Sequence, residues 1–391
     1  MISMKNNNAK KMTDVQSTNK SEVGESNNYP RISIILCNFN GLNYIKETLP
    51  KFIQFDYPNY EISLVDDGST DGSREWIEKF ITDYEKNFSK GSSGKKNKVD
   101  IVYYKNPENL GIPKSRNRAV LNATGDYYMF FDNDIICTDK NIFNNLLEYY
   151  KGKDKIAYLL IPLVDKERLE SGQTNQYGSY YSFYGIMRNK ILNIKDVMAI
   201  EGGYRCVVTF SQIFCSKKVW QDIGGFDERQ KFNLDDDDIS TRANVYGYEN
   251  WVYNKTYLIH TGLANRKDNR KYYNSFKLYY SGKVRPLLKN MQFRTLIYMI
   301  PMFYLSTCLM TLKQTITRKY PLVIFAFISS FFKSIADFPD TLKERKIIQA
   351  KRKVSDKSFL SVKFPLYSST KWYQEISLYF KDTISGKNST K

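Results

Sequence analysis

The chain has 391 residues, enough for one large domain and an appendage with an ample core. Its 31 Tyr and 24 Phe exclude a wholly disordered protein. The net charge of +18 is unevenly spread: residues 266–391 hold 25 Lys/Arg and 7 Asp/Glu, whereas residues 1–265 hold 34 of each sign. We therefore expect an acidic partner, an anionic membrane surface or nucleic acid, at the C-terminal third.

The five cysteines include no CxxC pair, and their odd number suits a reducing compartment. The first residues are polar, rich in Asn, Lys and Ser, and lack the apolar segment of a secretory signal. We expect residues 1–29 to form a disordered tail.

Apolar runs alternate with helical patterns from residue 31 onward. The runs 32–37, 60–65, 99–105 and 126–131 predict buried strands, and the segments between them predict helices. This alternation indicates βαβ units in an α/β fold with a mostly parallel, doubly wound sheet. Residues 151–260 are less regular, with strands expected at 156–164 and 206–216 and a helix beginning near residue 235.

Polar side chains gather where these strands end. In such sheets ligands bind at the carboxyl ends of the strands, so three clusters on one rim favour a ligand site over packing. The clusters are Asn38 with Asn40, Asp66 with Asp67, and Asp132 with Asp134.

Each acidic cluster suggests a chemistry and has a plainer alternative. Asp66 and Asp67 can accept hydrogen bonds from a nucleobase imide and a ribose hydroxyl, although the residues that follow are also good helix caps. The D-x-D at 132–134 can hold a hard divalent cation and leave positions for phosphate oxygens, with Asp134 the preferred ligand. A short acidic turn is the alternative.

Three further features are candidates. Gly111 opens a helix whose N-terminus, with Arg116, can face a diphosphate; a solvated basic face is the alternative, and we favour it for Lys114 and Arg118. The run 235–238 holds four aspartates at a helix N-terminus, where the dipole offsets repulsion, and one of them can take the proton of an acceptor hydroxyl. Asp238 and Arg242 are spaced to pair on the helix surface. His260, the only histidine, is either structural or a metal ligand.

Taken together, these motifs resemble the family 2 glycosyltransferases, which have the nucleotide-diphospho-sugar transferase (GT-A) fold. The resemblance covers residues 31 to about 262 and rests on ISIILCNFNG, YPNYEISLVDDGSTDGS, NPENLGIPKSRNRAV, GDYYMFFDND, GGFDE and DDDDISTR. The CNFNG opening favours the rhamnosyltransferase-like branch.

The resemblance implies roles for individual residues. Asp66 and Asp67 would contact the nucleoside, and Asp132 and Asp134 would serve ribose, diphosphate and Mg²⁺ or Mn²⁺. Asp236 falls on the position of the catalytic base. Asp235 stands where the family more often has Glu. If the match to the family's motif is shifted by one residue, Asp235 becomes the alternative base. His260 matches a histidine that in some members helps to bind metal or diphosphate. The expected nucleotide-sugar residues are Asn38, Asn40, Asp66, Asp67, Gly111, Arg116 and Asp132, and the expected metal ligands are Asp132, Asp134 and His260.

The implied activity is the metal-dependent, inverting transfer of one hexosyl or deoxyhexosyl group from a nucleotide-sugar. The acceptor would be a hydroxyl of a glycan or lipid-linked molecule in cell-surface glycan or glycoprotein assembly. The absence of a Q-x-x-R-W string argues against a processive synthase. The alternatives are a nucleotidyltransferase, which the loop NFNGLN disfavours, and a non-catalytic nucleotide-sugar-binding protein. We find no nucleic-acid-binding module and expect no nucleic-acid partner.

The C-terminal third carries two apolar stretches, 295–312 and 320–336, near the minimum length for a membrane span. If both spanned, their basic linker would lie across the membrane from the catalytic domain, whereas basic residues usually stay on the cytoplasmic side. An amphipathic hairpin on an anionic membrane surface fits better; a soluble helical subdomain and spanning helices are the alternatives. We expect a catalytic domain at 30–265, a basic membrane-associated helical region at 266–355 and a polar tail at 356–391. The expected location is the cytoplasmic face of the cell membrane, peripheral or monotopic.

Overall fold

The computed structural model describes residues 29–89, 97–181, 189–230, 234–262, 269–318 and 320–366. The tail expected at residues 1–29 lies, but for Tyr29, outside the described residues. The polar tail expected at 356–391 is described only to residue 366.

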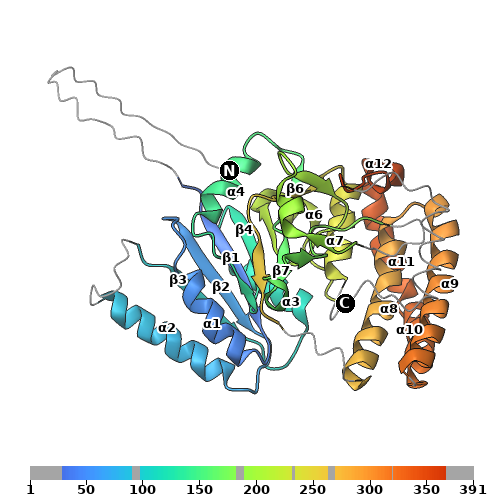
Figure 1. Ribbon diagram of the computed structural model, residues 1–391, viewed down its shortest axis with the longest axis horizontal. Coiled ribbons are helices and arrows are strands. Elements are labelled where there is room, and N and C mark those ends of the chain that lie inside the picture. Colours follow the sequence, from blue (N-terminus) through green and yellow to red (C-terminus); the bar gives the residue numbers. More distant parts are fainter. Residues whose placement is uncertain are drawn as a thin grey trace, which may run out of the picture.

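An eight-stranded sheet forms the centre of the α/β domain (Figure 1). Its order is β10-β12-β6-β11-β4-β1-β2-β3. The strands are β1 (Ile32–Asn38), β2 (Tyr60–Asp66), β3 (Asp100–Lys105), β4 (Tyr127–Asp132), β6 (Ile156–Leu160), β10 (Tyr204–Cys206), β11 (Ile213–Ser216) and β12 (Glu249–Val252). β1 is parallel to β2 and β4, and β2 is parallel to β3, whereas β11 is antiparallel to its neighbours β4 and β6. The expected α/β fold with a mostly parallel sheet is confirmed.

The first four predicted strands are confirmed within a residue or two, but each later one is broken. The run 156–164 divides into β6 and β7 (Leu163–Asp165), and Pro162 lies in the break because it has no N–H for a strand ladder. The run 206–216 divides into β10 and β11. Thr209, between them, donates its N–H to the Ser240 hydroxyl at 3.1 Å instead of to a strand.

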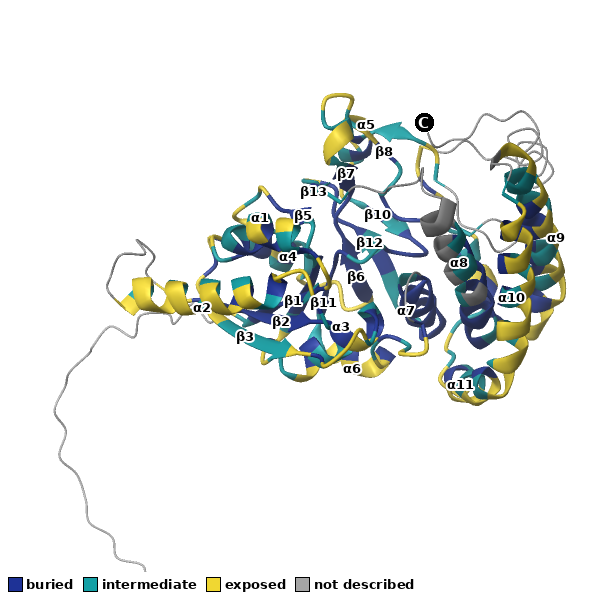
Figure 2. Ribbon diagram, turned by 90° about the horizontal axis from the view of Figure 1, so that it is seen from below, coloured by how far each residue is buried: buried dark blue, intermediate teal, exposed yellow. Residues whose placement is uncertain are grey.

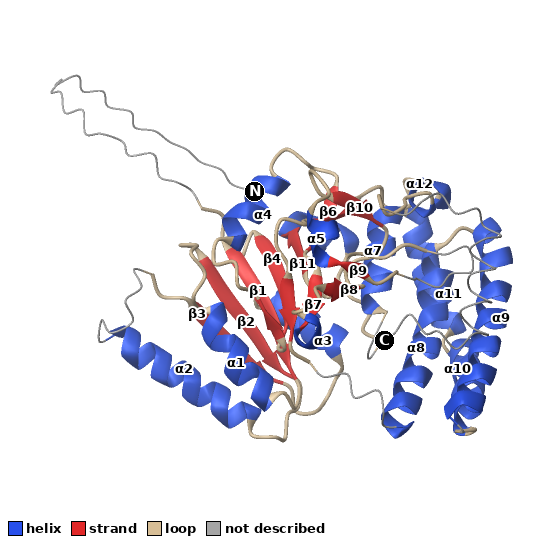
Figure 3. Ribbon diagram, viewed as in Figure 1, coloured by secondary structure: helices blue, strands red, loops and turns tan. Residues whose placement is uncertain are grey.

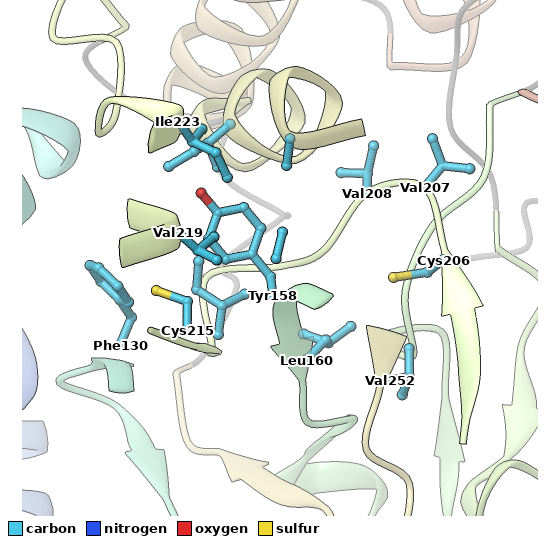
Figure 4. Close-up of a cluster of buried hydrophobic side chains, with 14 of the residues drawn as sticks. Phe130, Tyr158, Leu160, Cys206, Val207, Val208, Cys215, Val219, Ile223 and Val252 are labelled. Carbon is cyan, nitrogen blue, oxygen red and sulfur yellow. The ribbon is translucent and has the colours of Figure 1, made fainter. Parts of the chain in front are cut away.

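Helices cover both faces of the sheet (Figure 3). Alternate side chains of a strand point to opposite faces, so β1 contributes Ile34 to one core and Ile35 to the other. The core of Ile34 includes side chains from α1 (Leu42–Phe52), α2 (Ser73–Ser89) and α4 (Ile142–Tyr150). The core of Ile35 includes side chains from α3 (Ile112–Leu121), α6 (Lys217–Ile223) and α7 (Asp235–Val245). Figure 4 shows Tyr158 of β6 in that second core with Val219 and Ile223 of α6.

At the end of the sheet where β2 begins, a buried carboxylate joins three segments. Glu61 accepts hydrogen bonds from the Ser33 hydroxyl at 2.6 Å, the Thr124 N–H at 2.6 Å and the Arg31 guanidinium at 3.0 Å. Burial alone would raise the pKa of Glu61, but these bonds outweigh it and lower the pKa. Glu61 therefore stabilises the sheet as a carboxylate.

Two small sheets complete the domain. The first has the order β5-β13-β7, from β5 (Ile135–Ile136), β13 (Leu258–His260) and β7. The second pairs β8 (Gln173–Thr174) with β9 (Leu192–Asn193), next to the short helices η1 (Lys166–Arg168) and α5 (Ile194–Met198). In the first sheet His260 is registered with Ile135 and Asp165, which brings it to the segment that follows β4.

The C-terminal region is helical, as expected. Its helices are α8 (Asn269–Asn290), α9 (Phe293–Arg318), α10 (Leu322–Ala336), α11 (Phe338–Ala350) and α12 (Asp356–Leu360). α8 contacts α7 of the α/β domain on one side and α10 and α11 on the other. In Figure 1, α8 lies between the sheet and the outer pair α9 and α10. A separate apolar core, which includes Phe276, Phe303 and Val323, joins α8, α9 and α10.

Candidate active site

The rim expected from the sequence is formed by the carboxyl ends of β1, β2 and β4. Asn38 is registered with Asp66, and Cys37 is registered with Asp132. The three polar clusters are therefore neighbours.

Both aspartates after β2 are buried and hydrogen-bonded within the rim. Asp66 accepts hydrogen bonds from the Asn38 amide at 3.0 Å, the Ser69 N–H at 2.9 Å and the Arg74 Nε at 2.7 Å. Asp67 accepts hydrogen bonds from the N–H groups of Leu110 at 2.9 Å and Gly111 at 3.0 Å. Asp67 thereby holds the loop that leads into α3. Gly111 has φ of 93°, a backbone conformation that favours glycine.

The asparagines after β1 connect the same loops. The Asn38 amide oxygen accepts a hydrogen bond from Asn133 at 2.6 Å. Asn40 has φ of 47°, and its side-chain oxygen accepts a hydrogen bond from the Thr70 N–H at 2.8 Å. Asn133, the middle residue of the D-x-D, joins this turn to β1 through its bond to Asn38. An added Cβ at Gly41 would lie 2.0 Å from its amide nitrogen, so the turn and the start of α1 are closely packed.

Arg116 joins the rim to the aspartate helix. Its guanidinium is buried and donates to Asp132 at 2.6 Å and to Asp235 at 2.9 Å; a nitrogen lies 3.8 Å from Asp236. It also lies 5.3 Å from the centre of the Phe226 ring. Burial alone would lower the pKa of Arg116, but Asp132 and Asp235 outweigh it and raise the pKa. Arg116 is therefore a permanent cation inside the site and not part of a solvated face.

The two neighbouring basic residues differ from each other. Lys114 is exposed, as expected. Arg118 is half-buried and donates to the Asn106 side chain at 2.5 Å, so the expectation of a solvated Arg118 is wrong.

The four aspartates of α7 face two different environments. Asp235 bonds to Arg116, and the Asp236 side chain is 22% exposed. Burial, with the Asp235 charge beside it, raises the pKa of Asp236 well above the ordinary aspartate value, which increases its affinity for a proton. Asp237 and Asp238 point instead to α8, where Asp237 pairs with Lys283 and Asp238 accepts from Lys289 at 3.0 Å.

The predicted pair of Asp238 with Arg242 is present at 2.9 Å. It is buried, and not on the helix surface as expected. Arg242 also donates to the carbonyl of Gly225 at 2.8 Å, so the pair joins α7 to the GGFDE segment.

Asp134 and His260 form the candidate metal-binding pair. His260 Nε2 lies 3.1 Å from Asp134, and Nδ1 lies 3.0 Å from Asp165. Hydrogen bonds with Asp134 and then Asp165 raise the pKa of His260 to about 10. An added Cβ at Gly262 would lie 2.1 Å from Asp134 Oδ2 and 2.9 Å from His260 Nε2, so an alanine there would displace this pair.

The donor set fits a divalent cation that is completed by substrate oxygens. One carboxylate oxygen and one imidazole nitrogen converge, and Asp165 orients the ring through the other nitrogen. Within the described residues no group of three or more His, Cys, Asp or Glu side chains is arranged to hold a metal. Asp132 bonds to Arg116 and to Gln212, not to Asp134 or His260.

Several residues of this site were not predicted from the sequence. Gln212 donates to Asp132 at 2.8 Å, and Asp165 bonds to His260. Lys283 and Lys289 of α8 pair with the aspartates of α7 and are 0% and 1% exposed. The position of Asp165 at the end of a predicted strand, as with Asp66 and Asp132, was a signal that could have identified it.

Comparison with solved structures defines the class of the fold. The structure described as GalNAc-T7 with UDP, GalNAc and Mn²⁺ superposes with a TM-score of 0.53 at 14% identity, over 72% of this chain and 51% of that one. At this identity the likeness shows the fold alone, and that fold is the GT-A fold of nucleotide-sugar transferases.

The sequence comparisons show which family part of the chain resembles. Residues 33–209 match the model described as Glycosyl transferase family 2. It is 32% identical over 105 residues to the putative teichuronic acid biosynthesis glycosyltransferase TuaG of Bacillus subtilis, covering 27% of this chain and 36% of that protein. It is 34% identical over 114 residues to an uncharacterized glycosyltransferase of Haemophilus influenzae, covering 29% and 40%. The chain thus spans less than half the length of these relatives.

Proposed function

We propose that this glycosyltransferase moves one sugar from a nucleoside diphosphate sugar to an acceptor hydroxyl and inverts the anomeric configuration. The main support for this proposal is the ion cluster around Arg116. The Arg116 guanidinium bonds to Asp132 at the sheet rim and to Asp235 at the start of α7. A donor on the rim would then have its anomeric carbon near the aspartate helix.

Asp236 is the proposed base. It is the most exposed of the four aspartates in the run, and its pKa is raised by burial and by Asp235. The acceptor oxygen attacks the anomeric carbon as Asp236 takes its proton, and the sugar–phosphate bond breaks on the opposite side. Asp235 is less suitable as a base because Arg116 already bonds to its carboxylate at 2.9 Å.

The rest of the rim would bind the donor. We assign Asp66, Asp67, Asn38 and Asn40 to the nucleoside side of the site, and the N-terminus of α3 at Gly111 to the diphosphate. Asp134 and His260 would hold Mg²⁺ or Mn²⁺, with Asp132 beside them. When bound, the cation supplies charge neutralisation for the departing diphosphate.

A panel of UDP-, GDP- and dTDP-sugars with Mg²⁺ or Mn²⁺ tests the proposal. Metal-dependent thermal stabilisation and release of the nucleoside diphosphate are the expected results. Release of pyrophosphate would indicate a nucleotidyltransferase, and binding without turnover would indicate a binding protein. Asp236→Asn should lower transfer at least 100-fold, the lower range of general-base effects, and leave nucleotide affinity unchanged. Asp235→Asn is the comparison: if it loses the base function and Asp236→Asn retains it, the assignment is reversed.

A second proposal concerns the C-terminal helices, which we propose lie on an anionic membrane that carries a lipid-linked acceptor. Of the 20 exposed large hydrophobic side chains in the described residues, 16 lie on α9, α10 and α11, among them Phe325 at 61% and Phe332 at 63% exposed. Figure 2 shows exposed residues along the outer sides of α9 and α10. An apolar patch of this kind on a monomer favours a membrane or a partner.

We propose a peripheral or monotopic placement on the cytoplasmic face, supported by exposed basic side chains and by the bend between α10 and α11. Lys333, Lys343 and Lys346 are exposed among the apolar residues. In the part of the chain that the structure describes, one helix segment, Phe293–Thr317, is long and apolar enough to cross a membrane, with a mean hydropathy of 1.6, so a single span is the alternative. α10 and α11 pass the same test only together, and they are bent by 58°.

Co-sedimentation with vesicles tests this second proposal. The protein should bind vesicles of phosphatidylcholine with phosphatidylglycerol more tightly than phosphatidylcholine alone. Phe325→Ser with Phe332→Ser should reduce binding. Leu121→Ser, which removes an 83% exposed side chain from the catalytic domain, should not. Equal loss in both variants, or no vesicle binding by the full chain, would argue against a membrane surface.

A further inference from the structure

Gln212 lies beside the end of β4, although nothing in its sequence context marks it. It precedes β11, and the antiparallel register of Phe214 with Met129 brings it close to the carboxyl end of β4. Its side chain is buried, at 2% exposed, and Nε2 donates to Asp132 Oδ2 at 2.8 Å. The other oxygen of Asp132 accepts from Arg116. Gln212 and Arg116 therefore hold Asp132 from two sides.

The amide oxygen of Gln212 is buried and accepts no hydrogen bond from the described part of the chain. Turning the amide over would not help, because its oxygen would then face the Asp132 carboxylate, which is also an acceptor. A buried acceptor without a donor is costly. A bound ligand could supply the missing hydrogen bond to this oxygen.

Position distinguishes Gln212 from other buried amides. The side-chain oxygens of Asn250, Asn254 and Asn290 also lack donors. The first two amides donate to backbone carbonyls, and Asn290 donates to Asp238, whose side chain is 0% exposed. The partner of Gln212 is a carboxylate whose side chain is 32% exposed at the rim. The unpartnered oxygen belongs to the same amide group that touches this exposed carboxylate.

We propose that Gln212 recognises the donor: its Oε1 accepts a hydrogen bond from a hydroxyl of the bound nucleotide-sugar, and its Nε2 holds Asp132. This inference rests on the proposed function. The diphosphate and the divalent cation offer no hydrogen to an acceptor, and the proposed function assigns the nucleobase N–H groups to Asp66 and Asp67. The ribose and the transferred sugar both offer hydroxyls. The ligand chemistry is thus a sugar hydroxyl, with two possible sources in one molecule.

Deoxy analogues separate this role from the support of Asp132. The wild-type protein and Gln212→Met are titrated, with Mn²⁺, against UDP and GDP and their 2′-deoxy and 3′-deoxy forms. They are then titrated against UDP-glucose and GDP-mannose and the monodeoxy-sugar analogues of each. In the wild type one analogue should bind about 5- to 100-fold more weakly than its parent, as for loss of a hydrogen bond to a buried acceptor. In Gln212→Met that penalty should fall to less than about twofold.

The position of the affected hydroxyl identifies its source. A penalty on a ribose analogue assigns Oε1 to the ribose, and a penalty only on a sugar analogue assigns it to the transferred sugar. If Gln212→Met weakens the parent and every analogue by the same factor, Gln212 only positions Asp132 and the inference is overturned. A wild-type protein with no deoxy penalty overturns it without any variant. If no nucleotide or nucleotide-sugar binds the wild type, the proposed function itself fails, and this inference fails with it.

Discussion

Removing the Lys283 ammonium group would test whether α8 holds the aspartate helix in place. Lys283 is fully buried, pairs with Asp237 and lies 5.0 Å from the centre of the Tyr181 ring. Lys283→Met keeps the length of the side chain but leaves the Asp237 carboxylate, 2% exposed, without its cation. Removing one partner of a buried pair costs about 3–5 kcal/mol. That is a large part of the roughly 5–15 kcal/mol by which a folded protein is stable.

Urea unfolding of the full chain measures this loss. The matched control is Lys333→Met, which removes another ion pair of the C-terminal helices. Lys333 lies 2.7 Å from Asp337, but its side chain is 45% exposed. Such exposed pairs contribute about 0.5 kcal/mol or less, so the control should unfold almost as the wild type does.

The pH dependence of the stability lost in Lys283→Met is a second test of this pair. Burial raises the pKa of Asp237, and Lys283 acts to lower it, so the pKa rises further in Lys283→Met. A carboxyl whose folded pKa exceeds its unfolded value of about 3.9 loses stability as the pH rises between the two values. The deficit of the variant should therefore be smaller at about pH 5 than at about pH 7. Adding Asp237→Asn should recover much of it. A deficit below about 1 kcal/mol, or one that neither acid nor Asp237→Asn relieves, would refute the role of this pair.

Three further predictions concern the site and the sheet. Gly262→Ala should abolish the thermal stabilisation by Mn²⁺ with UDP, because its methyl group would lie 2.1 Å from Asp134. Gly152→Ala, whose methyl would meet nothing within 4 Å but whose φ of 71° disfavours alanine, should unfold at a lower temperature and still retain this stabilisation. Arg116→Lys should lower sugar transfer at least tenfold, measured as nucleoside diphosphate release, because an ammonium cannot replace the planar guanidinium that bonds to two carboxylates. Glu61→Gln should lower the free energy of unfolding, measured by urea titration at neutral pH, by about 1.5–3 kcal/mol, since it weakens charged hydrogen bonds. The lowered pKa of Glu61 means that its contribution is present above its unfolded pKa and is lost as the pH falls through its folded pKa, so this deficit should shrink in acid.

The parts of the fold that were predictable are those with strong periodicity. The runs that became β1 to β4 are continuous apolar segments, and parallel strands place their carboxyl ends together, so Asp66 and Asp132 were expected on one rim. The break between β6 and β7 has a local marker in the sequence, Pro162, which has no N–H for a strand ladder. The break between β10 and β11 has none, since it depends on the tertiary contact of Thr209 with Ser240.

The unpredicted part of the site depends on contacts between segments far apart in the chain. Lys283 and Lys289 lie in a helix with many basic residues, where a solvated face was the reasonable interpretation. Their burial follows only from the packing of α8 against α7. Arg116 shows the same difficulty, because it pairs with an aspartate 119 residues away. The role of Gln212 required the register of an antiparallel strand next to β4.

The pairing of α7 with α8 also has a consequence during synthesis of the chain. Asp237 leaves the ribosome 46 residues before its partner Lys283. At roughly 5–20 residues per second this interval lasts about 2–9 seconds. During it Asp237, which is buried in the finished protein, has no cation, because its partner Lys283 has not yet been made. We expect α7 to remain undocked on such a chain, so a ribosome-bound chain stalled with only residues 1–262 exposed should be digested by protease near 235–245. Protection of that segment before α8 has emerged would contradict this order of assembly.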